Sequence, residues 1–202
     1  MDLFALKGAI ERYRQEKEST TRDAAVLIPL VEGEDGPEVL LEVRAKTLAV
    51  QPGEVCLPGG GIEPGETPLE AAIRETCEEL LVGEDQIGIV GNMGVEPGPN
   101  GRSLHVFVGT LEGYEGTFSA DEVDRTFCLP LSWLASHEPR VFEVGMRPEF
   151  PDDFPWELIP NGKRYKWRSH RSGVPFYLGS DPLVWGATAR VLMRFARLWG
   201  ST

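Results

Sequence analysis

Cysteine is scarce in this chain, with three residues among 202. Cys56, Cys77 and Cys128 show no paired spacing and have no histidines at ligand distance, so we expect neither a disulfide framework nor a zinc site. No apolar run approaches the roughly 20 residues that span a bilayer, and residues 1–18 lack the apolar core of a signal peptide. These absences predict reduced thiols, a cytoplasmic location and no membrane partner.

Positive charge is also in short supply, since 20 Lys and Arg residues stand against 32 Asp and Glu residues and give a net charge of −12. Such a surface repels nucleic acids and anionic membranes, which excludes a general binder of either. Small anionic substrates stay compatible with this charge if a metal ion and local basic residues mask it. The hydrophobic content of 41% suffices for an ordinary core, and the length predicts a single domain over residues 1–202.

The stretch 58–82 concentrates glycine and glutamate, and its second half has strong signals for the start of a helix. Thr67 can cap the helix, and Glu70 lies three residues after this cap, so the two residues can satisfy each other's backbone donors. These signals predict a helix over 68–82, which Gly83 ends in the left-handed conformation. The part before Thr67 is so rich in glycine and proline that we expect an irregular loop there.

Three glutamates of this predicted helix, Glu75, Glu78 and Glu79, fall on one face because their spacings are three and four. Like charges at these spacings repel, and a hard divalent cation would reverse the effect. Mg²⁺ takes oxygen ligands and keeps room for waters and substrate phosphates. The competing interpretation is a solvated, glutamate-rich helix face. Arg74 lies beside the cluster and can pair bidentately with Glu66 or Glu75, which would fix a ligand in place.

The same stretch resembles the Nudix box, the string G-x5-E-x7-R-E-U-x-E-E-x-G-U. The matching positions are Gly60, Glu66, Arg74, Glu75, Glu78 and Glu79. Two positions depart from the string, because Thr76 stands where the family prefers an aliphatic residue and Leu81 stands where it prefers glycine. The resemblance implies an α/β fold, specifically an α/β/α sandwich with a mixed β-sheet, and hydrolysis of a pyrophosphate linked to a nucleoside.

The resemblance also implies roles for individual residues. It implies a Mg²⁺ site, with Mn²⁺ as an alternative ion, and a backbone segment at the glycines that binds the substrate. An acidic residue outside the box often completes such a site or serves as base, and Glu122 is our candidate, against the alternative of a solvated turn. The implied metal ligands are Glu75, Glu78 and Glu79; the implied catalytic residues are these three with Arg74 and Glu122; the implied substrate-binding residues are Gly59 and Gly60.

A second resemblance concerns the segment from Leu40 to Gly60, which is similar to the segment before the box in the coenzyme A pyrophosphatase branch of the family. Arg44 is one of the matches, and its guanidinium could bind a substrate phosphate, against the alternative of a surface ion pair. Glu42, Ala49 and Leu57 replace the Thr, Arg and Phe of that branch. This similarity implies that coenzyme A or its derivatives are cleaved to adenosine 3′,5′-bisphosphate and 4′-phosphopantetheine.

Two other functions stay open. The first is hydrolysis of another nucleoside diphosphate derivative, such as ADP-ribose. The second is a nucleotide-binding module that has kept the fold and lost hydrolysis, although the intact carboxylates disfavour it. Under each of them the partner is a small nucleotide, and a homodimer is left open.

The remaining chain gives a coarser prediction. A helix is expected over 1–18, strands over 24–31, 38–44, 54–57, 87–93 and 104–111, and an insertion or lid around 137–180. Within the insertion the basic segment 162–171 is expected to form a strand, either as a solvated hairpin or as a cationic strip near a phosphorylated substrate. A final helix is expected to begin with Asp181 as its cap and Pro182 as its first residue.

Overall fold

The computed structural model describes residue 7 and residues 23–98 and 101–200. The predicted helix over 1–18 therefore falls outside the described residues, apart from position 7. The main element is a mixed seven-stranded sheet in the order β3-β2-β1-β6-β5, with β4 paired to β1 and β7 paired to β2. Its strands are β1 (Ala24–Gly33), β2 (Gly36–Arg44), β3 (Val55–Cys56), β4 (Gly59–Gly61), β5 (Ile87–Pro97), β6 (Ser103–Leu111) and β7 (Val123–Pro130). The pair of β1 and β6 is parallel, and the other pairs of this sheet are antiparallel.

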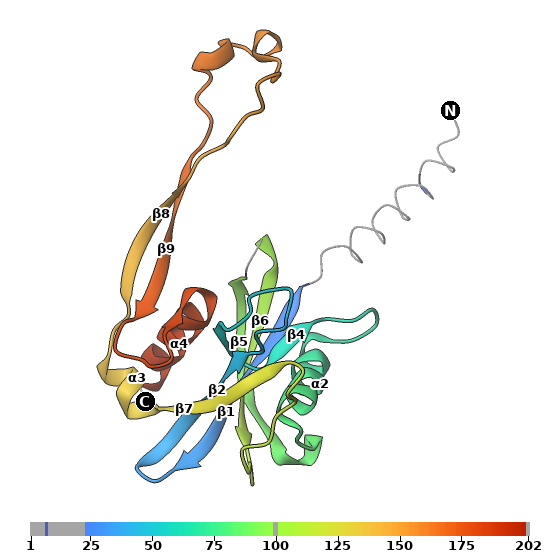
Figure 1. The fold of residues 1–202 in the computed structure, drawn as a ribbon, viewed down its shortest axis with the longest axis vertical. Helices are drawn as coiled ribbons and strands as arrows, with labels where there is room; N and C mark the ends of the chain where they lie inside the picture. Colours follow the sequence, from blue (N-terminus) through green and yellow to red (C-terminus); the bar gives the residue numbers. More distant parts are fainter. Residues whose placement is uncertain (1–6, 8–22, 99–100, 201–202) are drawn as a thin grey trace.

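Helices cover both faces of this sheet (Figure 1), and the alternation of side chains along β1 shows why. Ala25 and Leu27 pack beneath helix α2 (Pro68–Leu80). Val26 and Ile28 belong to the larger core on the other face, which helices α3 (Leu131–Ser136) and α4 (Gly186–Trp199) close. The predicted α/β/α sandwich with a mixed sheet is confirmed. The five predicted strands all appear, with shifted ends.

The glycine-rich segment before α2 differs from the expected loop. Gly59–Gly61 form β4, which pairs antiparallel with Ala24–Val26 at the start of β1. Gly59 takes a φ of 145°, which residues with a side chain rarely adopt, and an added Cβ would collide with the backbone of Ala25 and Val26. Because glycine removes that collision, the segment can lie flat against β1 as a strand.

A second, three-stranded sheet extends away from the body as an arm. Its strands are β8 (Arg140–Met146), β9 (His170–Tyr177) and β10 (Val184–Trp185). All seven residues of β8 are exposed, and aromatic rings cluster at the outer end of the arm, where Phe150 lies 4.7 Å from Trp156 and 5.0 Å from Trp167 between ring centroids. The expectation of an insertion or lid around 137–180 stays a prediction.

The basic segment 162–171 is not the single strand that we expected. It begins with a short 3-10 helix, η4 (Gly162–Arg164), and β9 starts only at its end, where His170 pairs with Met146. Beyond Met146 the opposing chain contains Pro148, Pro151 and Pro155. Proline has no backbone N–H to continue a ladder, so the pairing stops there. Another 3-10 helix, η3 (Trp156–Leu158), follows these prolines.

The predicted start of the last helix is also wrong, because α4 begins at Gly186 and not at Pro182. Val184 and Trp185 pair with β9 as β10, and the hydroxyl of Ser180 accepts a hydrogen bond from the Val184 N–H at 2.9 Å. Val184 and Trp185 are thus part of a strand, and the helix begins only after them.

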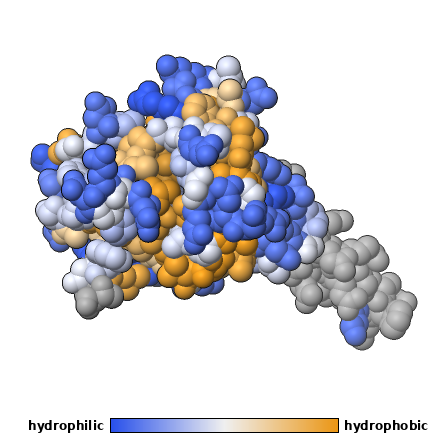
Figure 2. Space-filling view, turned by 90° about the horizontal axis from the view of Figure 1, so that it is seen from below, coloured by the Kyte–Doolittle hydropathy of each residue, from blue (hydrophilic) through white to orange (hydrophobic). Residues whose placement is uncertain are grey.

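The surface of the body is mixed in character. Seen from the end opposite the arm, hydrophobic residues form a broad strip between hydrophilic ones (Figure 2). Among the helices of the described residues, none has the length and apolar character that crossing a membrane would require.

Candidate active site

Helix α2 begins as the sequence predicts. The Thr67 hydroxyl accepts from the Glu70 N–H at 3.3 Å, and the Glu70 carboxylate accepts from the Thr67 N–H at 2.7 Å. This reciprocal pair confirms the capping box. The first turn of α2 is thereby fixed, and with it the direction in which the later glutamates project.

The end of α2 differs from the prediction, since the helix stops at Leu80 and Leu81 takes the left-handed conformation, with φ 55° and ψ 46°. Gly83, the predicted end, has an ordinary extended backbone. The last carbonyls of α2 are used by the loop before β7: Thr117 donates to the Leu80 carbonyl at 2.7 Å, and Ser119 donates to the Glu79 carbonyl at 2.8 Å. These bonds replace a further helical turn and hold the loop against the helix.

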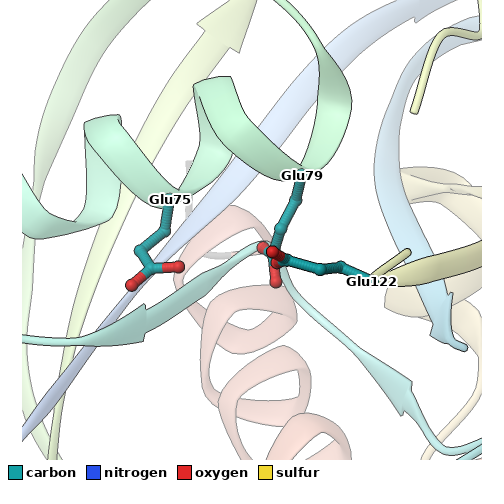
Figure 3. A group of neighbouring side chains, drawn as sticks. All are labelled: Glu75, Glu79 and Glu122. Atoms are coloured by element: carbon teal, nitrogen blue, oxygen red, sulfur yellow. The ribbon is translucent and has the colours of Figure 1, made fainter. Parts of the chain in front are cut away.

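That loop brings Glu122 to the glutamates of α2. Oxygen atoms of Glu75, Glu79 and Glu122 all lie within 4.8 Å of one another. Figure 3 shows Glu75 and Glu79 on successive turns of the helix, and Glu122 approaching from the far side so that its carboxylate meets that of Glu79. Glu79 is buried, Glu75 is half-buried and Glu122 is exposed. Three carboxylates around one point form a donor set that fits a hard divalent cation.

The glycines of β4 complete this arrangement from below. The Gly59 N–H donates to Glu79 Oε2 at 2.8 Å and so fixes one glutamate. At Gly60 an added Cβ would overlap the carboxyl group of Glu75. Glycine at position 60 therefore lets the strand lie directly beside the Glu75 carboxylate in its present position, while glycine at position 59 lets the strand approach β1. Substrate binding by Gly59 and Gly60 stays a prediction.

Arg74 organises the outer side of the cluster. Its guanidinium holds both oxygens of Glu66, with Nε at 2.8 Å and a terminal nitrogen at 3.2 Å, as one of the two predicted pairings requires. The other terminal nitrogen lies 3.0 Å from Glu75 and 3.2 Å from Glu78. The terminal nitrogen that bonds Glu66 also donates to the Gly61 carbonyl at 3.1 Å, so one side chain ties α2 to β4.

Glu78 is set apart from the other predicted ligands. It lies outside the group of three close carboxylates, its side chain is 54% exposed, and its contact is with Arg74. The assignments of Glu75, Glu78 and Glu79 as metal ligands, and of Glu122 as a catalytic residue, stay predictions.

One acidic residue beside the site, Glu42 on β2, is not among the residues predicted from the sequence. It is 1% exposed, the Cys56 thiol donates to its Oε1 at 3.1 Å, and its Oε2 has no hydrogen-bond partner among the described residues. The available signal was a glutamate inside the apolar run of a strand, Val39 to Val43, where a charge needs a reason.

Burial controls the electrostatics of these carboxyl groups. Loss of solvation, reinforced by the charge of Glu122, raises the pKa of Glu42 to about 7. Loss of solvation and the charge of Glu42 raise the pKa of Glu79 to about 9. Burial also raises the pKa of Glu75, although Arg74 acts in the opposite direction. The cluster therefore resists ionisation by itself, and a bound dication would favour the charged forms.

Arg44, the predicted phosphate contact, ends β2 beside this cluster. Its Nε donates to the Val50 carbonyl at 3.3 Å, which places the guanidinium next to the loop that leads to the glycines. Its positive charge acts on Glu42 and lowers the pKa of that carboxyl. Binding of a substrate phosphate by Arg44 stays a prediction.

The basic segment of the arm lies elsewhere. Figure 1 shows the outer end of the arm far from α2, beyond the opposite side of the body. Within one chain this segment does not border the carboxylates, so the conjecture of a cationic strip beside the substrate finds no support in this arrangement.

Comparison with known proteins adds the family context. The sequence model of the NUDIX domain matches residues 21–152. Nudix hydrolase 3 of Caenorhabditis elegans is 30% identical over 176 residues, which cover 83% of this chain and 69% of that protein. The peroxisomal coenzyme A diphosphatase ndx-8 of the same nematode is 39% identical over 122 residues, which cover 57% of this chain and 52% of that protein.

One solved structure supports the fold. A MutT/nudix family protein from Enterococcus faecalis aligns with a TM-score of 0.51 at 16% identity, over 89% of this chain and 62% of that chain. The present chain thus spans between 52% and 69% of the length of these three proteins.

Proposed function

This chain belongs to the Nudix hydrolase family, and on that premise we propose that it hydrolyses a pyrophosphate linked to a nucleoside, with coenzyme A or a derivative as the substrate. The products would be adenosine 3′,5′-bisphosphate and 4′-phosphopantetheine. We include the whole chain, residues 1–202, in one catalytic domain.

The observation that carries the proposal is the meeting of Glu75, Glu79 and Glu122 within 4.8 Å beside a strand of glycines. Their oxygens are the donors that Mg²⁺ prefers, and Mn²⁺ accepts the same set. Such an ion, when bound, lowers the pKa of a coordinated water and neutralises charge on the phosphoryl oxygens. A cation at the point where the three carboxylates meet would offset the repulsion among them.

The protein's own groups position the reaction. The Gly59 N–H holds Glu79, and Arg74 holds Glu75. The absence of side chains on β4 leaves space for a phosphate close to the carboxylates. Glu122 is the most exposed carboxylate of the group of three, which suits it to accept a proton from the attacking water. These contacts provide orientation, which is the main contribution of a protein to phosphoryl transfer.

The choice of coenzyme A rests on two supports. The segment from Leu40 to Gly60 resembles the coenzyme A branch, and the nematode relative named as a coenzyme A diphosphatase is 39% identical over 122 residues. Arg44 ends this segment's strand beside the cluster and is our proposed contact to a substrate phosphate.

Turnover of a substrate panel tests the proposal. The chain is incubated with Mg²⁺ and, separately, with coenzyme A, ADP-ribose, dinucleotides and nucleoside triphosphates, and products are identified by mass. We expect cleavage of coenzyme A at its pyrophosphate. If ADP-ribose is cleaved and coenzyme A is not, the substrate class is wrong; if every compound survives, a nucleotide-binding module replaces the hydrolase.

A further inference from the structure

Glu42 lies in the interior of the molecule and points towards α2. Side chains alternate along β2, and Leu40, two positions earlier, packs against Leu80 of that helix. Glu42 is therefore on the same face, where Glu79 is its acidic neighbour and the charges of the two carboxyl groups act on each other. With 1% of its surface exposed, Glu42 has almost no access to bulk water.

The two carboxyl oxygens of Glu42 differ in their surroundings. Oε1 accepts a hydrogen bond from the Cys56 thiol at 3.1 Å, which fixes the orientation of the group. Oε2 is buried and has no hydrogen-bond partner among the described residues. A buried polar atom without a partner costs about 1–3 kcal/mol, so a water, an ion or the neighbouring Glu79 carboxyl group has to satisfy it.

The charges near Glu42 identify the kind of ligand. The charge of Glu122 raises the pKa of Glu42, the charge of Glu42 raises the pKa of Glu79, and Arg44 of the same strand attracts the Glu42 carboxylate. Within the described part of the chain, none of the ion pairs includes Glu42. A positive species at this position would satisfy Oε2 and would offset the repulsion from both neighbours.

We propose that Glu42 is a further oxygen ligand of the divalent cation site, and that it binds the cation through Oε2 together with Glu79. The inference rests on the proposed function, because it extends the same metal site inwards from the surface of α2 to the strand below. Hard divalent ions take six or more oxygen ligands, so a further carboxylate is compatible with the coordination of Mg²⁺ or Mn²⁺.

Direct binding of Mn²⁺ to the full chain tests this role without any substrate. Free Mn²⁺ is measured by electron paramagnetic resonance during titration of the parent, of Glu42→Gln and of Glu96→Gln. Glu96 is the matched control because it is also buried, at 7% exposure, but pairs with Arg194 of α4 and not with the cluster. We expect Glu42→Gln to raise the Kd for Mn²⁺ at least about tenfold, and Glu96→Gln to leave it unchanged.

Thermal unfolding provides a second measurement of metal binding and also shows whether each variant is folded. The Glu42→Gln variant removes a repelled charge, so its thermal midpoint without metal should equal or exceed that of the parent, while its gain on addition of Mn²⁺ should be smaller. Glu42→Thr, which removes the carboxylate with a smaller side chain, replaces the first variant if glutamine prevents folding.

The outcomes separate the two proposals. If the parent binds Mn²⁺ and both Glu42 variants bind it with the same Kd and the same thermal gain, Glu42 is only a structural group and the inference is overturned. If the parent itself binds no Mn²⁺, the proposed metal-dependent function fails first. Suppose instead that a Glu42 variant has a lower thermal midpoint without metal, but that Mn²⁺ raises this midpoint as much as it does in the parent. Glu42 would then contribute to the packing of the core and not to metal binding.

Discussion

The outer and inner sides of the α2 cluster balance their charges in different ways. On the outer side Arg74 contacts Glu66 and Glu78 within 3.2 Å, and its hydrogen bonds hold the pKa of Glu66 below its usual value. On the inner side Glu79 and Glu42 meet away from solvent, and their pKa values are raised. The outer side carries its own cation in Arg74, whereas in our proposal the inner side takes one from solution.

This difference explains why a repulsive arrangement can persist in a stable fold. An arginine satisfies carboxylates permanently and therefore suits positions that must be rigid. In our proposal the metal site keeps Glu79 free of a permanent cation while Arg74 holds Glu75 from the outer side, and the site is less stable without the ion. Three changes should break or sharpen the contrast between the two sides, and a fourth concerns the helix end that links them.

The largest effect is expected for Glu79→Gln on the inner side. It removes a central carboxylate but keeps an oxygen that can accept from the Gly59 N–H, so the fold should persist. We expect kcat to fall by roughly 10³-fold or more, equivalent to about 4 kcal/mol, and the thermal midpoint without metal to hold or rise. Steady-state kinetics and thermal unfolding measure the two. Glu112→Gln, an exposed glutamate elsewhere, is the control; near-parental turnover in Glu79→Gln would remove that residue from the metal site.

The pH dependence of stability should have opposite signs on the two sides when no metal is present. Glu42 has a raised pKa, so its contribution is complete below pH 4.5 and is lost as the pH rises towards about 7. That change corresponds to about 3 kcal/mol, or roughly 10 °C in the thermal midpoint. Glu66 has a lowered pKa, so its contribution is present above pH 4.5 and is lost as the pH falls.

Thermal midpoints measured between pH 4 and 8 in a chelating buffer check this expectation. The parent should lose stability above pH 4.5, Glu42→Gln should lose less, and added Mg²⁺ should flatten the decline. A midpoint that rises steadily from pH 5 to 8 without metal would show that the inner carboxylates ionise freely.

A smaller effect is expected for Arg74→Lys on the outer side. Lysine keeps the charge but cannot hold both oxygens of Glu66 and also reach Glu75. We expect kcat/KM to fall by about 10- to 100-fold, because a positioning contact to a proposed ligand is lost. Arg125→Lys serves as control, since Arg125 is an exposed arginine that lies 3.7 Å from its neighbour Asp124. Equal activity of both variants would mean that Glu75 needs no support from Arg74.

Local signals in the sequence indicated the contacts of the outer side; on the inner side Glu79 and Glu122 came from the family resemblance, and Glu42 was not predicted. Thr67, Glu70 and Arg74 act on residues within one or two turns of helix, so spacing alone indicated their contacts. Glu42 meets Glu79 only because β2 passes under α2, and Glu122 meets them because its loop is bonded to the end of the helix. Contacts that depend on packing between distant segments leave no periodic signal in one sequence.

The errors at element ends have a similar cause. The start of α4 and the extent of β9 depend on which backbone groups find partners in another strand. The end of α2 was placed at Gly83 because glycine is the usual residue in the left-handed position. The structure places Leu81 there instead, since the loop before β7 takes the carbonyls of Glu79 and Leu80.

The smallest effect is expected for Leu81→Gly at the helix end that joins both sides. Leu81 has φ 55°, which strains a residue with a side chain, and its side chain is 59% exposed, so little burial is lost on truncation. Glycine there should stabilise the protein by about 1 kcal/mol, or roughly 2–4 °C in the thermal midpoint. The matched control is Leu81→Ala, which trims the side chain but keeps the strain and should not gain stability.

Because Leu81 contributes no group to the carboxylate cluster, kcat/KM should stay at the parental value in both variants. Denaturant unfolding and kinetics measure the two quantities, and a glycine variant that is less stable than the alanine variant would show that the left-handed turn is not strained.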